Sequence, residues 1–109
     1  MKQGSFSGSQ VARQIPGDVG IIGIRWQGDG ANDIVFDLSV ADWRGELTCF
    51  WVSDLKIELN YGEYSGVIPA FNCEITQIEK AGWSVMFDLS PVGSVSLKCN
   101  ELQLGVHKP

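Results

Sequence analysis

Apolar and polar side chains alternate along most of the chain from Val19 onward. A period of two residues is the pattern of a β-strand with one buried and one solvated face. Strands of this kind are typical of antiparallel sheets that are covered on one side. No segment carries a helical stripe of ten or more residues. The clearest alternating segments are 34–40, 55–60, 83–89 and 94–99.

Glycine and proline punctuate these segments at the positions expected for turns. Residues 27–30 and 80–82 predict hairpin loops, because glycine adopts positive φ without steric cost. Residues 90–93 predict a turn in which Pro91 fixes φ. The spacing indicates seven or eight short strands. We therefore expect an all-β antiparallel fold, either a β-sandwich or a flattened barrel.

A short phrase recurs along the chain: Phe-Asp-Leu-Ser occupies 36–39 and again 87–90. Allowing small gaps, the flanking segments also match, which predicts two duplicated four-strand units at about 21–59 and 73–106 with a connector at 60–71. Chance similarity between hairpins is the alternative. Two units with one apolar face each would bury those faces against one another. Residues 19–107 then form a single β domain, and the Gly- and Ser-rich residues 1–18 are expected to be a flexible or loosely docked arm.

Composition limits the classes of partner. The chain has 109 residues, 44% hydrophobic and 19% charged, with a formal net charge of −5. A negative surface repels phosphate backbones and anionic lipids, so nucleic acid and membranes are poor partners. The polar first ten residues lack the apolar core of a signal peptide, and the three cysteines are odd in number and far apart. These features predict free thiols and a cytoplasmic protein.

No catalytic, cofactor or metal motif is present. The single histidine, His107, stands near the end of the chain, and no Cys/His spacing suits a metal. Phosphate-binding glycine loops are also absent. Asp37 and Asp88 occupy equivalent positions in the two units, but outward residues of two opposed sheets lie on opposite faces. We expect both to be solvated or paired with a residue of a neighbouring strand, and predict neither an enzyme nor a bound cofactor.

The tryptophans and the connector carry the candidate binding chemistry. Trp51 and Trp83 follow the apolar phase of their strands and are expected in the core, whereas Trp26 and Trp43 either close the end of the core or are exposed enough to bind. The connector segment 60–66 combines two tyrosines, an acid and two glycines, as binding loops do. Closure of the sandwich edge by these tyrosines is the alternative.

The order of these segments resembles the small immunity proteins of bacterial polymorphic toxin systems. The resemblance is carried by Ile24 to Trp26, by 36–38, by 55–58 and by 99–102. It implies a non-enzymatic cytoplasmic inhibitor that sets acidic residues against the basic active site of a toxin. The family assigns no binding residues that transfer to this chain.

We therefore expect a non-catalytic module that binds a basic partner protein, and a monomer or homodimer. Trp43, Tyr61 and Tyr64 would be the anchors, and Glu46, Glu58 and Glu63 would supply negative charge. Two other classes remain open. One is a small-ligand or carbohydrate-binding domain that uses Trp26 or Trp43. The other is a structural unit that dimerises through a sheet edge.

Overall fold

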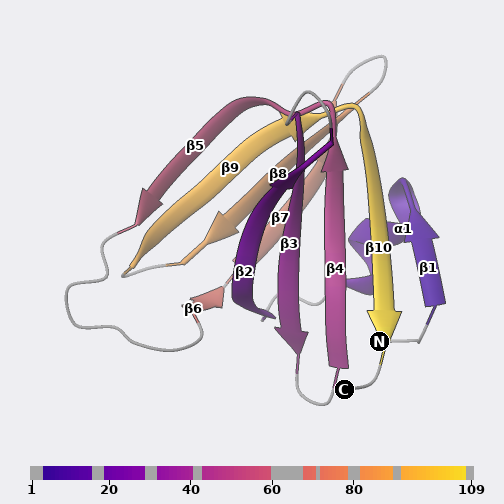
Figure 1. Cartoon of the computed structure of the whole chain (residues 1–109), viewed down its shortest axis with the longest axis horizontal. Coiled ribbons are helices and arrows are strands. Elements are labelled where there is room, and N and C mark those ends of the chain that lie inside the picture. Colours follow the sequence, from indigo (N-terminus) through magenta and orange to yellow (C-terminus); the bar gives the residue numbers. More distant parts are fainter. Residues whose placement is uncertain are drawn as a thin grey trace.

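The computed structural model describes residues 4–15, 19–28, 32–40, 43–59, 68–70, 72–78, 82–89 and 92–107. Within these ranges the chain forms ten strands and one short helix (Figure 1). In chain order they are β1 (Gly4–Ser7), α1 (Ser9–Gln14), β2 (Val19–Gln27), β3 (Asp33–Val40), β4 (Trp43–Phe50), β5 (Ser53–Leu59), β6 (Ile68–Ala70), β7 (Asn72–Gln77), β8 (Trp83–Asp88), β9 (Gly93–Cys99) and β10 (Glu101–His107).

The strands form two antiparallel sheets that lie as two layers (Figure 1). The six-stranded sheet has the order β1-β10-β4-β3-β2-β6, and the four-stranded sheet the order β5-β9-β8-β7. The prediction of an all-β antiparallel fold is confirmed. Of the two architectures left open by the sequence, the structure has the sandwich, because within the described ranges each sheet ends in edge strands. β1 and β6, both at the edges of the six-stranded sheet, are additional to the seven or eight strands expected.

The core lies between the sheets and is made of the inward side chains of each strand. Phe36 on β3 and Phe87 on β8 are both fully buried, and their ring centroids lie 5.0 Å apart across the two layers. No polar or charged residue is among the buried ones described. Removal of apolar surface from water therefore supplies the main stabilisation. The inward residues around this pair include Leu38, Leu47, Val85, Val95, Leu97 and Leu104.

The two proposed repeat units have the same connectivity. In the first, β2, β3 and β4 run side by side and β5 crosses to the other sheet, where it pairs with β9. In the second, β7, β8 and β9 run side by side and β10 crosses back to pair with β4. The registers also correspond, since Phe36 lies opposite Leu47 and Phe87 opposite Val95. This agreement supports a duplication, which stays a prediction.

The two crossings, from β4 to β5 and from β9 to β10, lie side by side. At this bend the pairing of β4 with β10 continues into the pairing of β5 with β9. β10 pairs with β4 up to Glu101 opposite Phe50, and β9 pairs with β5 from Lys98 opposite Ser53. Between these pairs, the backbone N–H of Asn100 donates to the carbonyl oxygen of Phe50 at 2.9 Å. The bend needs unusual backbone angles, and Trp51 and Asp54 both have positive φ, at 57° and 51°.

Residues 4–15 belong to the segment 1–18, which was expected to be a flexible or loosely docked arm, and they dock on the sandwich. β1 pairs with the edge strand β10, and α1 contacts β1, β7 and β10. Val11 is fully buried and Ile15 is 8% exposed, and both belong to the core. Figure 1 shows α1 beside β1 and β10 at one side of the sandwich. Two apolar residues four positions apart share one face of a helical turn, and their burial outweighs the surrounding glycines and serines.

Candidate functional site

The outward face of the six-stranded sheet carries a compact set of polar residues. Residues directly opposite one another in an antiparallel pair point to the same side of the sheet. Phe36 and Leu47 point inward, so the next row, which contains Asp37 and Glu46, points outward. We call the outward surface formed by Arg25, Asp37, Glu46, Thr48, Gln103 and Gly105 the outer face.

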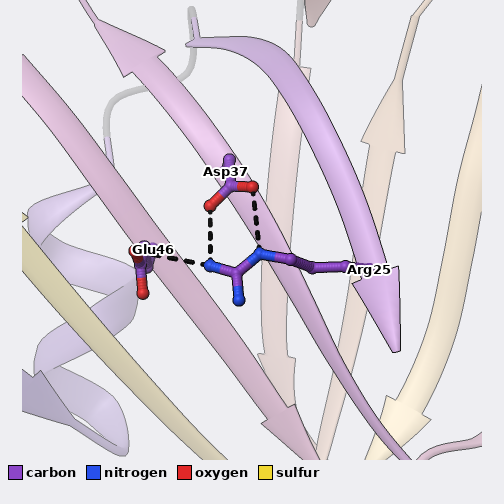
Figure 2. Close-up of polar contacts among 3 residues, drawn as sticks. All are labelled: Arg25, Asp37 and Glu46. Carbon is purple, nitrogen blue, oxygen red and sulfur yellow. Dashed lines mark hydrogen bonds and ion pairs between the residues drawn. The ribbon is translucent and has the colours of Figure 1, made fainter. Parts of the chain in front are cut away.

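Arg25 joins two carboxylates on this face (Figure 2). Its Nε lies 3.2 Å from Asp37 Oδ2 and its Nη2 lies 3.1 Å from Asp37 Oδ1, which is the two-pronged geometry that favours a guanidinium. The same Nη2 lies 3.4 Å from Glu46 Oε1. The hydrogen bond and charge of Asp37 raise the pKa of Arg25 above its ordinary value. Two carboxylates therefore share one cation, and the trio keeps one net negative charge.

Glu46 is the member of this trio that remains most open to solvent. Its side chain is 54% exposed, against 29% for Asp37. Asp37 packs closely against the backbone of Gly23, since a Cβ atom at position 23 would lie 2.9 Å from Asp37 Oδ2. Among the residues that the structure describes, Glu46 is oriented through the single contact of its Oε1 with Arg25. The second carboxylate oxygen is therefore left to accept hydrogen bonds from outside.

Two shallow depressions flank Glu46. One, of about 370 Å³, is lined by residues 5–7 of β1, by Glu46 and Thr48 of β4, and by residues 103–105 of β10, among which Phe6 and Leu104 are apolar. The other, of about 230 Å³, is lined by Glu46 with Asp37, Arg44, His107 and Ile22. The floor of the first is open above Gly105, since a Cβ atom there would meet no other atom within 4 Å. A carboxylate beside a hollow that is rich in hydroxyl and amide groups suits a cationic side chain.

Two further polar residues, Arg44 and His107, line the smaller depression. His107 is exposed on β10, lines the smaller depression and lies opposite Arg44 in the ladder. Arg44 donates to Ser39 Oγ at 2.9 Å and to the carbonyl oxygen of Trp43 at 3.2 Å. Within the described ranges, no group of three His, Cys, Asp or Glu side chains is placed to hold a metal ion. Asp37 and Asp88 lie on different sheets.

The structure separates the contact residues that the sequence predicted. Glu46 lies on the outer face, whereas Glu58 is exposed on β5 in the other sheet. Trp43 begins β4, is partly buried and packs against the core. Tyr61, Glu63 and Tyr64 lie outside the described residues. Their role in binding, like that of Trp43 and Glu58, stays a prediction.

The expectation that Trp51 lies in the core is wrong. Its side chain is 65% exposed, and its backbone N–H donates to Asp33 Oδ1 at 3.2 Å. The positive φ of Trp51 at the sheet crossing interrupts the alternation on which the expectation was based. Trp26 is 52% exposed at the end of β2. Trp83 is partly buried against the core, as its phase predicts.

Sequence reasoning did not identify Arg25, Gly105 or the adjacent hollows. Arg25 and Asp37 come from the neighbouring strands β2 and β3. They are diagonal neighbours because a shift in the register between Ile21 and Gly23 sets Gly23 opposite Asp37. Gly105 lies opposite Glu46 because β10, a strand of the second unit, pairs with β4. No signal in the sequence reports a pairing between strands so far apart along the chain.

Comparison with known proteins adds no assignment: no protein-family model, curated protein or solved structure matches the chain. In the part of the chain that the structure describes, no helix has the length and apolar character needed to cross a membrane.

Proposed function

We propose that the protein is a non-catalytic binding module that engages a basic partner protein through the outer face. Glu46 receives a lysine or arginine side chain of the partner in the depression above Gly105. The observation that carries this proposal is a carboxylate that is oriented by Arg25, half exposed, and shared by two depressions.

The charge of the whole chain supports the same partner class. The formal net charge of −5 attracts a basic protein over distances of about 8 Å at physiological salt, and raises the rate of encounter. On contact, an arginine or lysine beside Glu46 adds a charge-assisted hydrogen bond. Because Arg25 already orients the carboxylate of Glu46, little further orientational freedom is lost on binding. An inhibitor of a toxin with a basic active site, as the resemblance to immunity proteins implies, is one specific form of this function.

The first test is affinity capture from lysate of the source cell, followed by calorimetry with the purified partner. We expect one stoichiometric basic protein that separates at high salt. Glu46→Gln removes a hydrogen bond between charged groups, so Kd should rise about 10- to 100-fold. Gly105→Leu fills the depression without changing charge and should weaken binding as strongly. Neither change should lower Tm appreciably, because both positions are open to solvent.

Glu74→Lys is the matched control for charge, since Glu74 is an exposed carboxylate on β7 of the other sheet. The corresponding change Glu46→Lys should abolish binding, and Glu74→Lys should reduce only the rate of association. Equal affinity of the wild type, Glu46→Lys and Gly105→Leu would exclude the outer face as the contact surface. The variants Tyr61→Ala and Tyr64→Ala test in parallel whether the connector contributes to binding of the partner.

A second candidate, binding of a carbohydrate or another small ligand, is favoured by the two exposed indole rings of Trp26 and Trp51. An exposed indole gives a sugar ring an apolar face on which to stack. In that case tryptophan fluorescence should respond to a sugar, and Trp51→Ala or Trp26→Ala should remove the response. An unchanged spectrum across a broad panel of sugars would exclude this candidate.

A further inference from the structure

Two of the three cysteines lie in the core on different sheets. Cys49 is on β4 of the six-stranded sheet and is fully buried, and Cys99 ends β9 of the four-stranded sheet and is 3% exposed. Both belong to the same hydrophobic cluster, and both thiols are free. The third, Cys73 on β7, is only partly buried.

Cys49 and Cys99 each lie next to one of the two crossings between the sheets, from β4 to β5 and from β9 to β10. Each cysteine comes immediately before a residue of the bend: Phe50 follows Cys49, and Asn100 follows Cys99. The backbone hydrogen bond of 2.9 Å between Asn100 and Phe50 therefore ties the two strands beside the cysteines. Both side chains point inward, because the cysteines are buried whereas Lys98 and Asn100 are exposed. Both cysteines therefore lie on the core side of the crossing.

The thiols are in contact through a hydrogen bond. The bond to Cys99, together with burial, raises the pKa of Cys49, and the same bond lowers the pKa of Cys99. Cys99 is therefore the thiol of this pair that ionises more readily. Cys73 differs, because burial and the charge of Glu74 raise its pKa to about 12.

We propose that Cys49 and Cys99 are a disulfide-forming pair, oxidised by a low-molecular-weight disulfide such as glutathione disulfide, and that the bond locks the two sheets together. The Cys99 thiolate attacks the reagent, which forms a mixed disulfide and releases one glutathione thiolate. That thiolate takes the proton of Cys49. The Cys49 thiolate then attacks the Cys99 sulfur and displaces the second glutathione, which takes a proton from water. One reagent disulfide is reduced as one protein disulfide forms.

The bond should stabilise the fold because it links residues that are distant along the chain. Closing a long loop in the unfolded chain removes much of its conformational entropy. For a chain of this length, we expect the oxidised protein to melt about 10 °C above the reduced one. Oxidation should be slow, because the reagent reaches Cys99 only when the strand crossing opens locally.

The test is to incubate the folded, reduced protein with glutathione disulfide, alkylate the remaining thiols and map the peptides by mass spectrometry. We expect two thiols to disappear, one linked peptide joining Cys49 to Cys99, and Cys73 alkylated. The intact mass should fall by two hydrogen atoms without an added glutathione. The melting temperature should rise and return on reduction.

Cys73→Ala is the matched control and should oxidise with the same yield and the same rise in Tm. Cys49→Ala and Cys99→Ala should each lose the linked peptide and the rise. Because either variant can unfold, the mapping of the wild-type chain decides the proposal independently. Three thiols that stay free after prolonged oxidation, stable glutathione adducts, or a bond that involves Cys73 would each overturn it.

Discussion

The ring pair Phe36–Phe87 provides a quantitative test of how the two sheets pack. Both side chains are fully buried, with centroids 5.0 Å apart and planes inclined at 50°. Such pairs contribute about 0.5–1.5 kcal/mol beyond the burial of their area. Replacing either ring by leucine retains an apolar side chain but leaves a cavity and removes the pair, so each single change should cost about 1–2 kcal/mol.

The double variant should cost less than the two single variants together, because the pair can be lost only once. The difference is the coupling energy, which we expect to be about 0.5–1.5 kcal/mol. Urea denaturation measures it, provided that all four proteins unfold in one cooperative transition with the same m-value. A domain stability of about 5–15 kcal/mol leaves the double variant folded.

The control is a second cycle with Phe36→Leu and Phe6→Leu. Phe6 lies in the same inward row but three strand steps away, through Leu47 and Leu104. At about 4.8 Å per step the two rings are too far apart to interact directly, and their effects should add to within about 0.5 kcal/mol. Coupling between Phe36 and Phe87 that is no larger than this control value would refute the contact between the layers.

Three further predictions concern the N-terminal segment and the backbone. Val11→Ala should cost about 2 kcal/mol in urea denaturation, because two fully buried methyl groups are lost, whereas a detached segment would show no change. Gly93→Ala should cost more than about 2 kcal/mol, since Gly93 has φ 150° and a Cβ atom would overlap the Glu58 carbonyl oxygen; an unchanged Tm would contradict this contact. Trp51→Gly should change stability by less than about 1 kcal/mol, because relief of the left-handed conformation offsets the entropy cost of glycine. The comparison is Trp43→Gly, which removes a ring packed on the core and should be clearly more costly.

The candidate site shows where sequence reasoning stops. Glu46 was identified from charge and position, and its outward direction follows from the alternation within β4. Its contact with Arg25 and the hollow above Gly105 depend on neighbours from β2 and β10. Pairing between strands is set by burial and backbone hydrogen bonds summed over the whole sheet, and no local pattern encodes it.

What the sequence determined by itself was the fold class, most strand segments and the inward phase of Phe36 and Phe87, since alternation fixes which face of a strand is apolar. The tertiary structure alone decided the docking of Val11, the exposure of Trp51 and the meeting of Cys49 with Cys99. The docking of Val11 depends on the packing of α1 against β1, β7 and β10, and the other two depend on where strands cross between the sheets. At a crossing the backbone leaves the regular period of two, and contacts form between residues that are distant along the chain.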